Sequence, residues 1–125
     1  MTTLNVPLLI AGILITLAAL IHSIAGEITT IRSLASAELK QAPKLELRAV
    51  WYMVAVHLFA SAIMLFILAF AVNRDVVMGR FLAIQFFGYG LAFLGLAVVK
   101  QVRLFQVPQW VLCFLMAGLT FWGTG

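Results

Sequence analysis

Four long apolar runs, separated by short polar stretches, dominate this 125-residue sequence. A helix needs about 20 mostly apolar residues to cross roughly 30 Å of hydrocarbon, and the runs approach or exceed this length. Because backbone groups inside a bilayer must satisfy one another, a spanning segment is either a helix or a strand of a closed barrel. Barrel strands alternate apolar and polar residues, and these runs do not. The sequence therefore predicts transmembrane helices over residues 6–31, 45–72, 80–99 and 106–122.

The composition excludes an ordinary soluble domain. Hydrophobic residues make up 65% of the chain and charged residues 10%, whereas soluble domains are about half apolar and about a quarter charged. A chain of this length cannot hide so much apolar surface in a water-surrounded interior. The net charge of +4 comes from basic residues scattered between the apolar runs, so they form no basic face and we expect no nucleic-acid partner. We expect one domain, residues 1–125, with a lipid bilayer as its surroundings.

Short connections join the apolar runs, so neighbouring helices should pack antiparallel. The predicted fold is an all-α, up-and-down bundle of four transmembrane helices. Loops rich in Lys and Arg tend to remain in the cytoplasm, and the basic residues divide six to two between the two sides: Arg32, Lys40, Lys44, Arg48, Lys100 and Arg103 against Arg74 and Arg80. This bias predicts a multi-pass inner (plasma) membrane protein with loops 33–42 and 100–103 in the cytoplasm and both termini outside.

Two histidines lie inside the predicted helices, where ionisable side chains are costly and mark candidate functional sites. His22 precedes Arg32 by ten residues and His57 follows Arg48 by nine, which places both about 13 to 15 Å from the basic band. In an antiparallel hairpin the two side chains are therefore level. Small residues share their faces, as is typical of sides by which membrane helices approach one another. We expect both imidazoles to point into the bundle and to meet directly or through a metal ion or water.

Glu27 lies a little over one turn closer to the basic band than His22. A carboxyl group at that depth is either kept neutral by desolvation or held ionised by a nearby cation. The side chains of Arg48, Lys100 and Arg103 lie at the same side of the membrane and can reach Glu27 by snorkelling. Ser23 can help to solvate it. The predicted ligand site or proton relay is therefore His22, Ser23, Glu27 and His57, with Arg48, Trp51 and Tyr52 as supporting residues.

Several cofactor interpretations remain open for these residues. His22, His57 and Glu27 supply the ligand types of a two-histidine, one-carboxylate metal site, and Met53 and Met64 add soft ligands for Cu(I). Haem b between two histidines is less favoured, because a porphyrin would force the helices beyond the usual separation of about 8 to 10 Å. Hydrogen bonding within the bundle, with no cofactor, is the structural alternative.

The segment His22-Ser23-Ile24-Ala25-Gly26-Glu27 resembles a His-Ser-x-x-Gly-Glu motif. That motif lies in the first helix of a group of small, functionally uncharacterised bacterial four-helix inner-membrane proteins. The resemblance extends loosely to Arg48-Ala49-Val50-Trp51 at the start of the second helix, where the relatives tend to have a histidine next and this chain has Tyr52. The resemblance implies a fold and a favoured site and implies no reaction.

Three classes of function compete. The chain is predicted to bind or transport a ligand, metal ion or proton at its polar site, to serve as a haem- or quinone-linked redox subunit, or to act as a structural subunit of a larger complex. An enzyme is less favoured, because no Ser-His-Asp, Cys-His or paired-carboxylate set appears outside the predicted spans. A stripe of small residues, Gly88, Ala92 and Gly95, suits close packing within the monomer or against a second copy in a homodimer.

Overall fold

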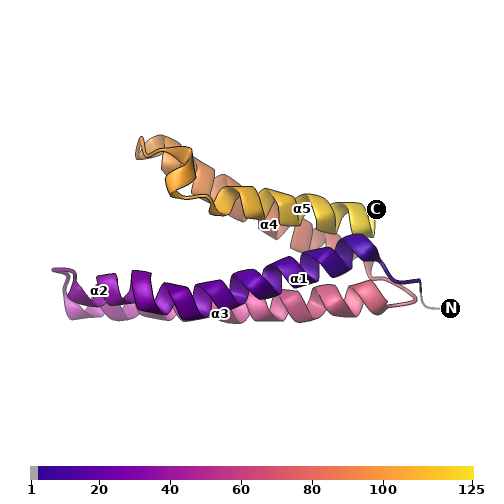
Figure 1. Cartoon of the computed structure of the whole chain (residues 1–125), viewed down its shortest axis with the longest axis horizontal. Coiled ribbons are helices and arrows are strands. Elements are labelled where there is room, and N and C mark those ends of the chain that lie inside the picture. The colour runs from indigo at the N-terminus through magenta and orange to yellow at the C-terminus, as the bar shows by residue number, and fades with distance from the viewer. Residues whose placement is uncertain (1–2) are drawn as a thin grey trace.

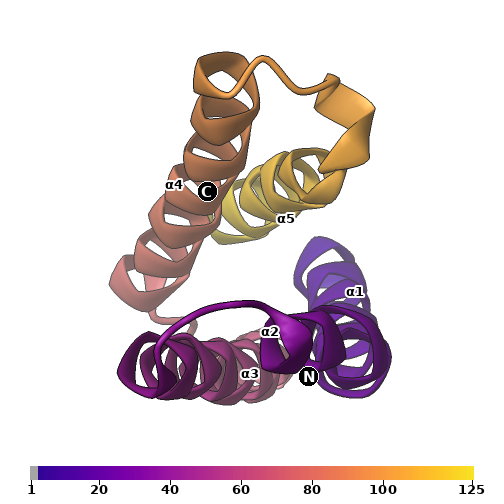
Figure 2. The same cartoon turned by 90° about the vertical axis from the view of Figure 1, so that its left-hand side faces the viewer.

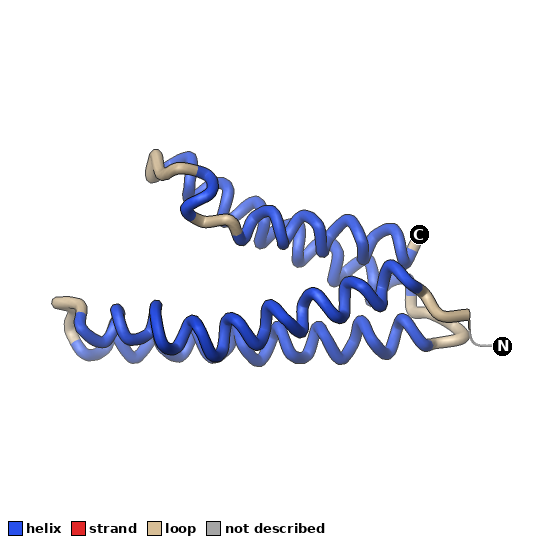
Figure 3. Tube along the Cα trace, viewed as in Figure 1, coloured by secondary structure: helices blue, strands red, loops and turns tan. Residues whose placement is uncertain are grey.

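The computed structural model describes residues 3–125, and all regular secondary structure in that range is helical (Figure 3). The first long helix is formed by four consecutive segments: α1 (Val6–Leu20), two π-helical turns (Ile21–Ala25 and Glu27–Ile31) and α2 (Arg32–Ser36). It is followed by α3 (Gln41–Phe70), α4 (Val76–Val99), a 3₁₀ turn (Leu104–Gln106) and α5 (Gln109–Thr124). The chain therefore has the predicted all-α, four-helix architecture.

Three of the four helices are long and apolar enough to cross a membrane, namely Val6–Ser36, Gln41–Phe70 and Val76–Val99. The fourth, α5, is apolar but has only 16 residues, which gives it a length of about 24 Å. Many large apolar side chains point outward, and Ile24, Ile63, Ile84 and Val98 are each more than 60% exposed. By length and composition this is a multi-pass membrane protein whose outer faces contact lipid.

Local sequence signals explain where the helices begin and end. The Asn5 side chain caps α1 by accepting a hydrogen bond from the Leu8 amide at 3.1 Å, and Asp75 caps α4 by accepting one from Met78 at 3.0 Å. Such side chains satisfy amide groups that have no partner within the helix. Helix α4 ends where Gln101 adopts a left-handed φ of 53° and the Val102 amide donates to the Ala97 carbonyl at 3.0 Å. This arrangement is a Schellman cap.

The helix boundaries differ from the predicted ones at their polar ends. The first helix continues to Ser36 instead of ending at 31, α3 begins at Gln41 instead of 45 and ends at Phe70 instead of 72, and α4 begins at Val76 instead of 80. Helix α5 covers Gln109–Thr124 instead of 106–122. The extensions arise because hydropathy marks only the apolar part of a helix, whereas the backbone continues to form hydrogen bonds into the polar flanks. Helix α3 ends earlier because Ala71 is extended, and α5 begins later because residues 104–106 form a 3₁₀ turn. The connections consequently become 37–40, 71–75 and 100–108.

The helices form two antiparallel hairpins, α1–α2 with α3 and α4 with α5 (Figures 1 and 2). Helix α1 also packs against α5, whereas α3 and α4 make few contacts although they are neighbours in sequence. The hairpins meet at the end that carries both chain termini and loop 71–75, here called the terminal end. They diverge toward the end that carries loops 37–40 and 100–108, here called the basic end (Figure 1).

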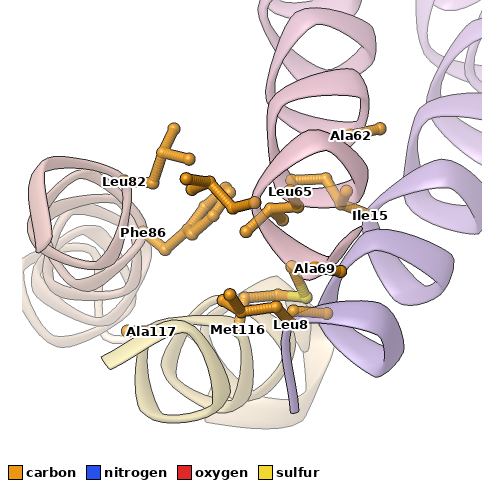
Figure 4. Packing of buried hydrophobic residues seen from close by; sticks show 11 residues of the cluster. Leu8, Ile15, Ala62, Leu65, Ala69, Leu82, Phe86, Met116 and Ala117 are labelled. Carbon is orange, nitrogen blue, oxygen red and sulfur yellow. The ribbon is translucent and has the colours of Figure 1, made fainter. Parts of the chain in front are cut away.

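A cluster of buried apolar side chains joins the hairpins in the terminal half (Figure 4). Leu8 and Ile15 from α1 meet Leu65 from α3, Phe86 from α4 and Met116 from α5. Asn5 closes this end further, because its side-chain Nδ2 donates to the Gly123 carbonyl at 2.7 Å and its backbone amide donates to the Ala69 carbonyl at 3.0 Å. The terminal half is therefore the tightly packed part of the molecule.

Candidate functional site

A cleft of about 800 Å³ lies between the two hairpins. One wall comes from the α1–α3 hairpin and the other from α4 and α5. The lining side chains are mostly apolar, with a few polar groups among them: Ala18, Ile21, His22, Ala25, Gly26, Thr29, Thr30, Val50, Trp51, Met53, Val54, His57, Leu58, Tyr89, Phe93, Gln109, Leu112 and Cys113. This composition and size match ligand sites, which are largely apolar, have a few convergent polar groups and measure about 300 to 1,000 Å³.

His22 is held against Trp51 of α3. The two rings are stacked, with centroids 3.8 Å apart and planes at 17°, and His22 Nε2 lies 3.1 Å from the Trp51 backbone carbonyl oxygen. Because a carbonyl oxygen can only accept, Nε2 carries the hydrogen, and Nδ1 of the neutral ring remains an acceptor. The Trp51 contact therefore sets both the orientation and the tautomer of His22.

Gly26 allows this contact by leaving room for the Trp51 ring. A Cβ added at Gly26 would lie 2.2 Å from Cζ2 and 2.8 Å from Cη2 of Trp51, well inside ordinary van der Waals contact. The π-helical turns Ile21–Ala25 and Glu27–Ile31 lie on either side of Gly26. Single π turns are frequent at functional sites, and they change which side chains share a face.

Glu27 forms an ion pair with Arg48 of α3, with Arg48 Nη2 and Glu27 Oε1 3.0 Å apart. Arg48 Nε also donates to the Tyr52 hydroxyl at 2.8 Å, so the predicted supporting residues Arg48 and Tyr52 do contact each other. The paired side chains are 47% and 40% exposed, which makes the pair a lateral contact outside the cleft. Ser23 Oγ is buried without a hydrogen-bond partner, so it does not solvate Glu27.

His57 lines the cleft from α3 and faces Tyr89 of α4 across it. Its Nε2 is 3.3 Å from the Ser61 hydroxyl oxygen, and its ring meets the Tyr89 ring edge-on, with centroids 5.5 Å apart. Sequence reasoning did not select Tyr89, Gln109 or Cys113 as site residues. No spacing motif identifies them, because they reach the cleft only through the tertiary arrangement of α4 and α5.

Both histidines line one cleft, but each has its own protein partner. Within residues 3–125, no group of three or more His, Cys, Asp or Glu side chains lies close enough to hold a metal ion. The predicted set of His22, Glu27 and His57 is thus not assembled as a metal centre. Any metal ion or haem b binding through Nε2 would have to displace the Trp51 carbonyl from His22 and the Ser61 hydroxyl from His57. Met53 lines the cleft, whereas Met64 packs against the buried cluster.

The small-residue stripe of α4 faces away from the rest of the molecule. Gly88, Ala92 and Gly95 are all exposed, and a Cβ added at Gly88 or Gly95 would meet no atom within 4 Å. The stripe is therefore not used for packing within the monomer.

The two segments of the resemblance contact each other directly. His22 and Gly26 from the first segment touch Trp51 from the second, and Glu27 pairs with Arg48. No known protein family, curated protein or solved structure matches the chain. Because a fold by itself does not specify a function, the function must be inferred from the chemistry of the cleft.

Proposed function

We propose that this multi-pass membrane protein binds a small amphipathic molecule in the cleft between its hairpins, with His22, His57 and Tyr89 as polar contacts. The observation that carries the proposal is the presence of two imidazoles and a phenol on the walls of one largely apolar cleft of about 800 Å³. The polar groups would orient the ligand, and the apolar side chains around them would supply most of the binding free energy.

The depth of the cleft supports a ligand that arrives from the bilayer. Counted from the terminal end, His22 lies about 24 Å along the first helix from Val6, and His57 lies about 20 Å along α3 from Phe70. Both depths fall within the roughly 30 Å of hydrocarbon. Polar groups at such depth have no bulk water to bind, so a ligand with its own donors or acceptors gains by pairing with them.

The ligand roles follow from the hydrogen-bonding states of the side chains. His22 presents Nδ1 as an acceptor because Nε2 donates to the Trp51 carbonyl. The Ser61 hydroxyl holds one nitrogen of His57, and the Tyr89 hydroxyl both donates and accepts. A ligand carbonyl or hydroxyl suits this set.

The test is native mass spectrometry of the full chain purified in a mild detergent, followed by solvent extraction of any bound molecule. Val54 lines the cleft, so Val54→Trp should fill it and remove the bound species. Ile63→Trp is the matched control on the same helix, because Ile63 is 61% exposed and does not line the cleft. Equal ligand occupancy in wild type and both variants would refute the proposal.

The redox and structural alternatives give different results in the same preparation. A haem-linked subunit would show an intense visible absorption band, and a quinone would be recovered in the extract. A structural subunit would co-purify with a protein partner and carry no small molecule that Val54→Trp removes.

We further propose an inner-membrane location with the basic end in the cytoplasm and both termini outside. The six basic residues at one end against two at the other support this orientation. Kinship with the small bacterial membrane proteins that carry His-Ser-x-x-Gly-Glu also remains our proposal, supported by the mutual contacts of the two segments. A homodimer through the exposed face of Gly88, Ala92 and Gly95 is compatible with both the proposed location and the proposed kinship.

A further inference from the structure

The cleft is shaped for a long apolar chain. Half of its lining residues are Ala, Ile, Val, Met, Leu or Phe, and Trp51, Tyr89 and Cys113 add further apolar surface. It extends along α3 from Val50 to Leu58, a depth of about 12 Å. The hairpins diverge toward the basic end (Figure 1), so a chain entering there would have its polar end near loops 37–40 and 100–108.

The α4–α5 hairpin supplies positive charge at that end. From Val76 onward the sequence contains no Asp or Glu, and two of its three basic residues, Lys100 and Arg103, lie in loop 100–108. The structure described for residues 3–125 has one ion pair, between Glu27 and Arg48. Lys100 and Arg103 therefore have no acidic side chain as a partner.

The cations of the opposite hairpin are more fully engaged. Arg48 is bound by Glu27 and Tyr52, and Lys44 Nζ donates to the Ala35 carbonyl at 2.9 Å. Arg32 and Lys40 lie on the same rim, but that rim also carries Glu38 and Glu46. Loop 100–108 carries two cations and no acidic residue, so it offers the better anion site of the two rims.

Loop 100–108 also has the side chains of a membrane interface. Phe105 is 76% exposed and packs at a tilt against Trp110, whose Nε1 donates to the Leu104 carbonyl at 2.9 Å. Aromatic rings beside basic residues are typical of the headgroup level of a bilayer. Lys100 and Arg103 are therefore placed where lipid phosphates lie.

We propose that the cleft takes an acyl chain of an anionic phospholipid whose phosphate lies on Lys100 and Arg103; this proposal rests on the cleft being a ligand site. Basic pockets between transmembrane helices bind anionic lipid headgroups in this way. Charge complementarity selects the headgroup, and the apolar walls from Val50 to Leu58 select the chain.

The test titrates the full chain in mild detergent with phosphatidylglycerol or phosphatidylcholine of identical acyl chains, read by native mass spectrometry. We expect wild type to prefer phosphatidylglycerol. The double substitution Lys100→Gln with Arg103→Gln should lower the affinity for phosphatidylglycerol by about five-fold for each cation removed. It should leave the affinity for phosphatidylcholine unchanged. Val54→Trp should lower the affinity for both lipids. Arg32→Gln with Lys40→Gln, which removes two cations from the other hairpin at the same end, should change little.

Four results would overturn the proposal. If both lipids bind equally and Val54→Trp weakens both, the cleft remains a ligand site but its ligand is not anionic. If the control pair of substitutions lowers the affinity for phosphatidylglycerol as much as Lys100→Gln with Arg103→Gln does, only the overall charge of the protein matters. If Val54→Trp leaves phosphatidylglycerol binding intact, the chain does not occupy the cleft. If glycerol phosphate alone binds as tightly as the lipid, the site recognises phosphate without an acyl chain.

Discussion

Gly26→Ala tests the contact that orients His22. The added Cβ would lie 2.2 Å and 2.8 Å from two carbon atoms of the Trp51 ring, more than 0.5 Å inside ordinary contact at both atoms. Such overpacking forces side-chain and backbone shifts that cost about 1–3 kcal/mol. Because alanine in place of glycine also gains about 1 kcal/mol of helix propensity, we expect the free energy of unfolding to fall by up to about 2 kcal/mol, as measured by SDS titration in mixed micelles with far-ultraviolet circular dichroism as the readout. The Trp51 ring should also leave its stack on His22, which changes the tryptophan fluorescence.

The chain offers two controls for this substitution. Gly88→Ala adds the same methyl group where nothing lies within 4 Å, so it should be neutral or stabilise by up to about 1 kcal/mol through helix propensity. In a Trp51→Leu background no indole ring is present to clash, so Gly26→Ala should change the free energy of unfolding little. A double-mutant cycle should therefore assign most of the effect of Gly26→Ala to its coupling with Trp51. The same cost in both backgrounds would refute the assigned contact.

Three further substitutions test the helix ends and the ion pair, all by the same unfolding titration. Asn5→Ala should destabilise the protein by about 1–3 kcal/mol, because it removes the cap of α1 and the hydrogen bond to Gly123. The control Asn73→Ala, in an exposed loop, should be neutral, and equal losses of stability in the two variants would contradict the capping role. Gln101→Gly should stabilise by about 1 kcal/mol, since φ of 53° disfavours residues with a Cβ, and a loss of stability would argue against the Schellman cap. Glu27→Gln should cost less than about 1 kcal/mol, because the Glu27–Arg48 pair is exposed, whereas a loss several times larger would show that the pair is buried in the membrane-bound protein.

Sequence reasoning predicts the helices well because hydropathy directly reports which segments prefer lipid to water. It predicts their faces poorly, because helices that are apolar on most sides carry no periodic signal that separates an inner face from an outer one. The pairing of α1 with α5, and the divergence of α3 from α4, depend on such faces. For the same reason the sequence does not predict Tyr89 beside His57 or Cys113 on the same cleft.

The site illustrates a second limit. The level depth of His22 and His57 follows from counting residues, and the structure places both on one cleft. The partner of His22 does not follow from counting, because the π turns at Ile21–Ala25 and Glu27–Ile31 break the 3.6-residue periodicity used to assign faces. Pairing of Glu27 with a cation was predictable from depth and charge, whereas the choice of Arg48 over Lys100 or Arg103 required the helix arrangement.

The proposed ligand site requires a cleft that separates α3 from α5 at the level of His57. Val54 on α3 and the native Cys113 on α5 line this cleft from different hairpins, and a disulfide needs Cα atoms within about 7 Å. In Val54→Cys we therefore predict little cross-linking to Cys113 under mild oxidation. Gly79→Cys with Thr124→Cys, in a Cys113→Ala background, is the close-pair control: a Cβ at Gly79 lies 2.9 Å from that of Thr124, so the two need to separate by only about 0.6 Å to reach the disulfide range of about 3.5 Å and should cross-link. Cross-linking of Val54→Cys to Cys113 as fast as this control pair would contradict the account, because it would show the hairpins closed on each other where the ligand should lie.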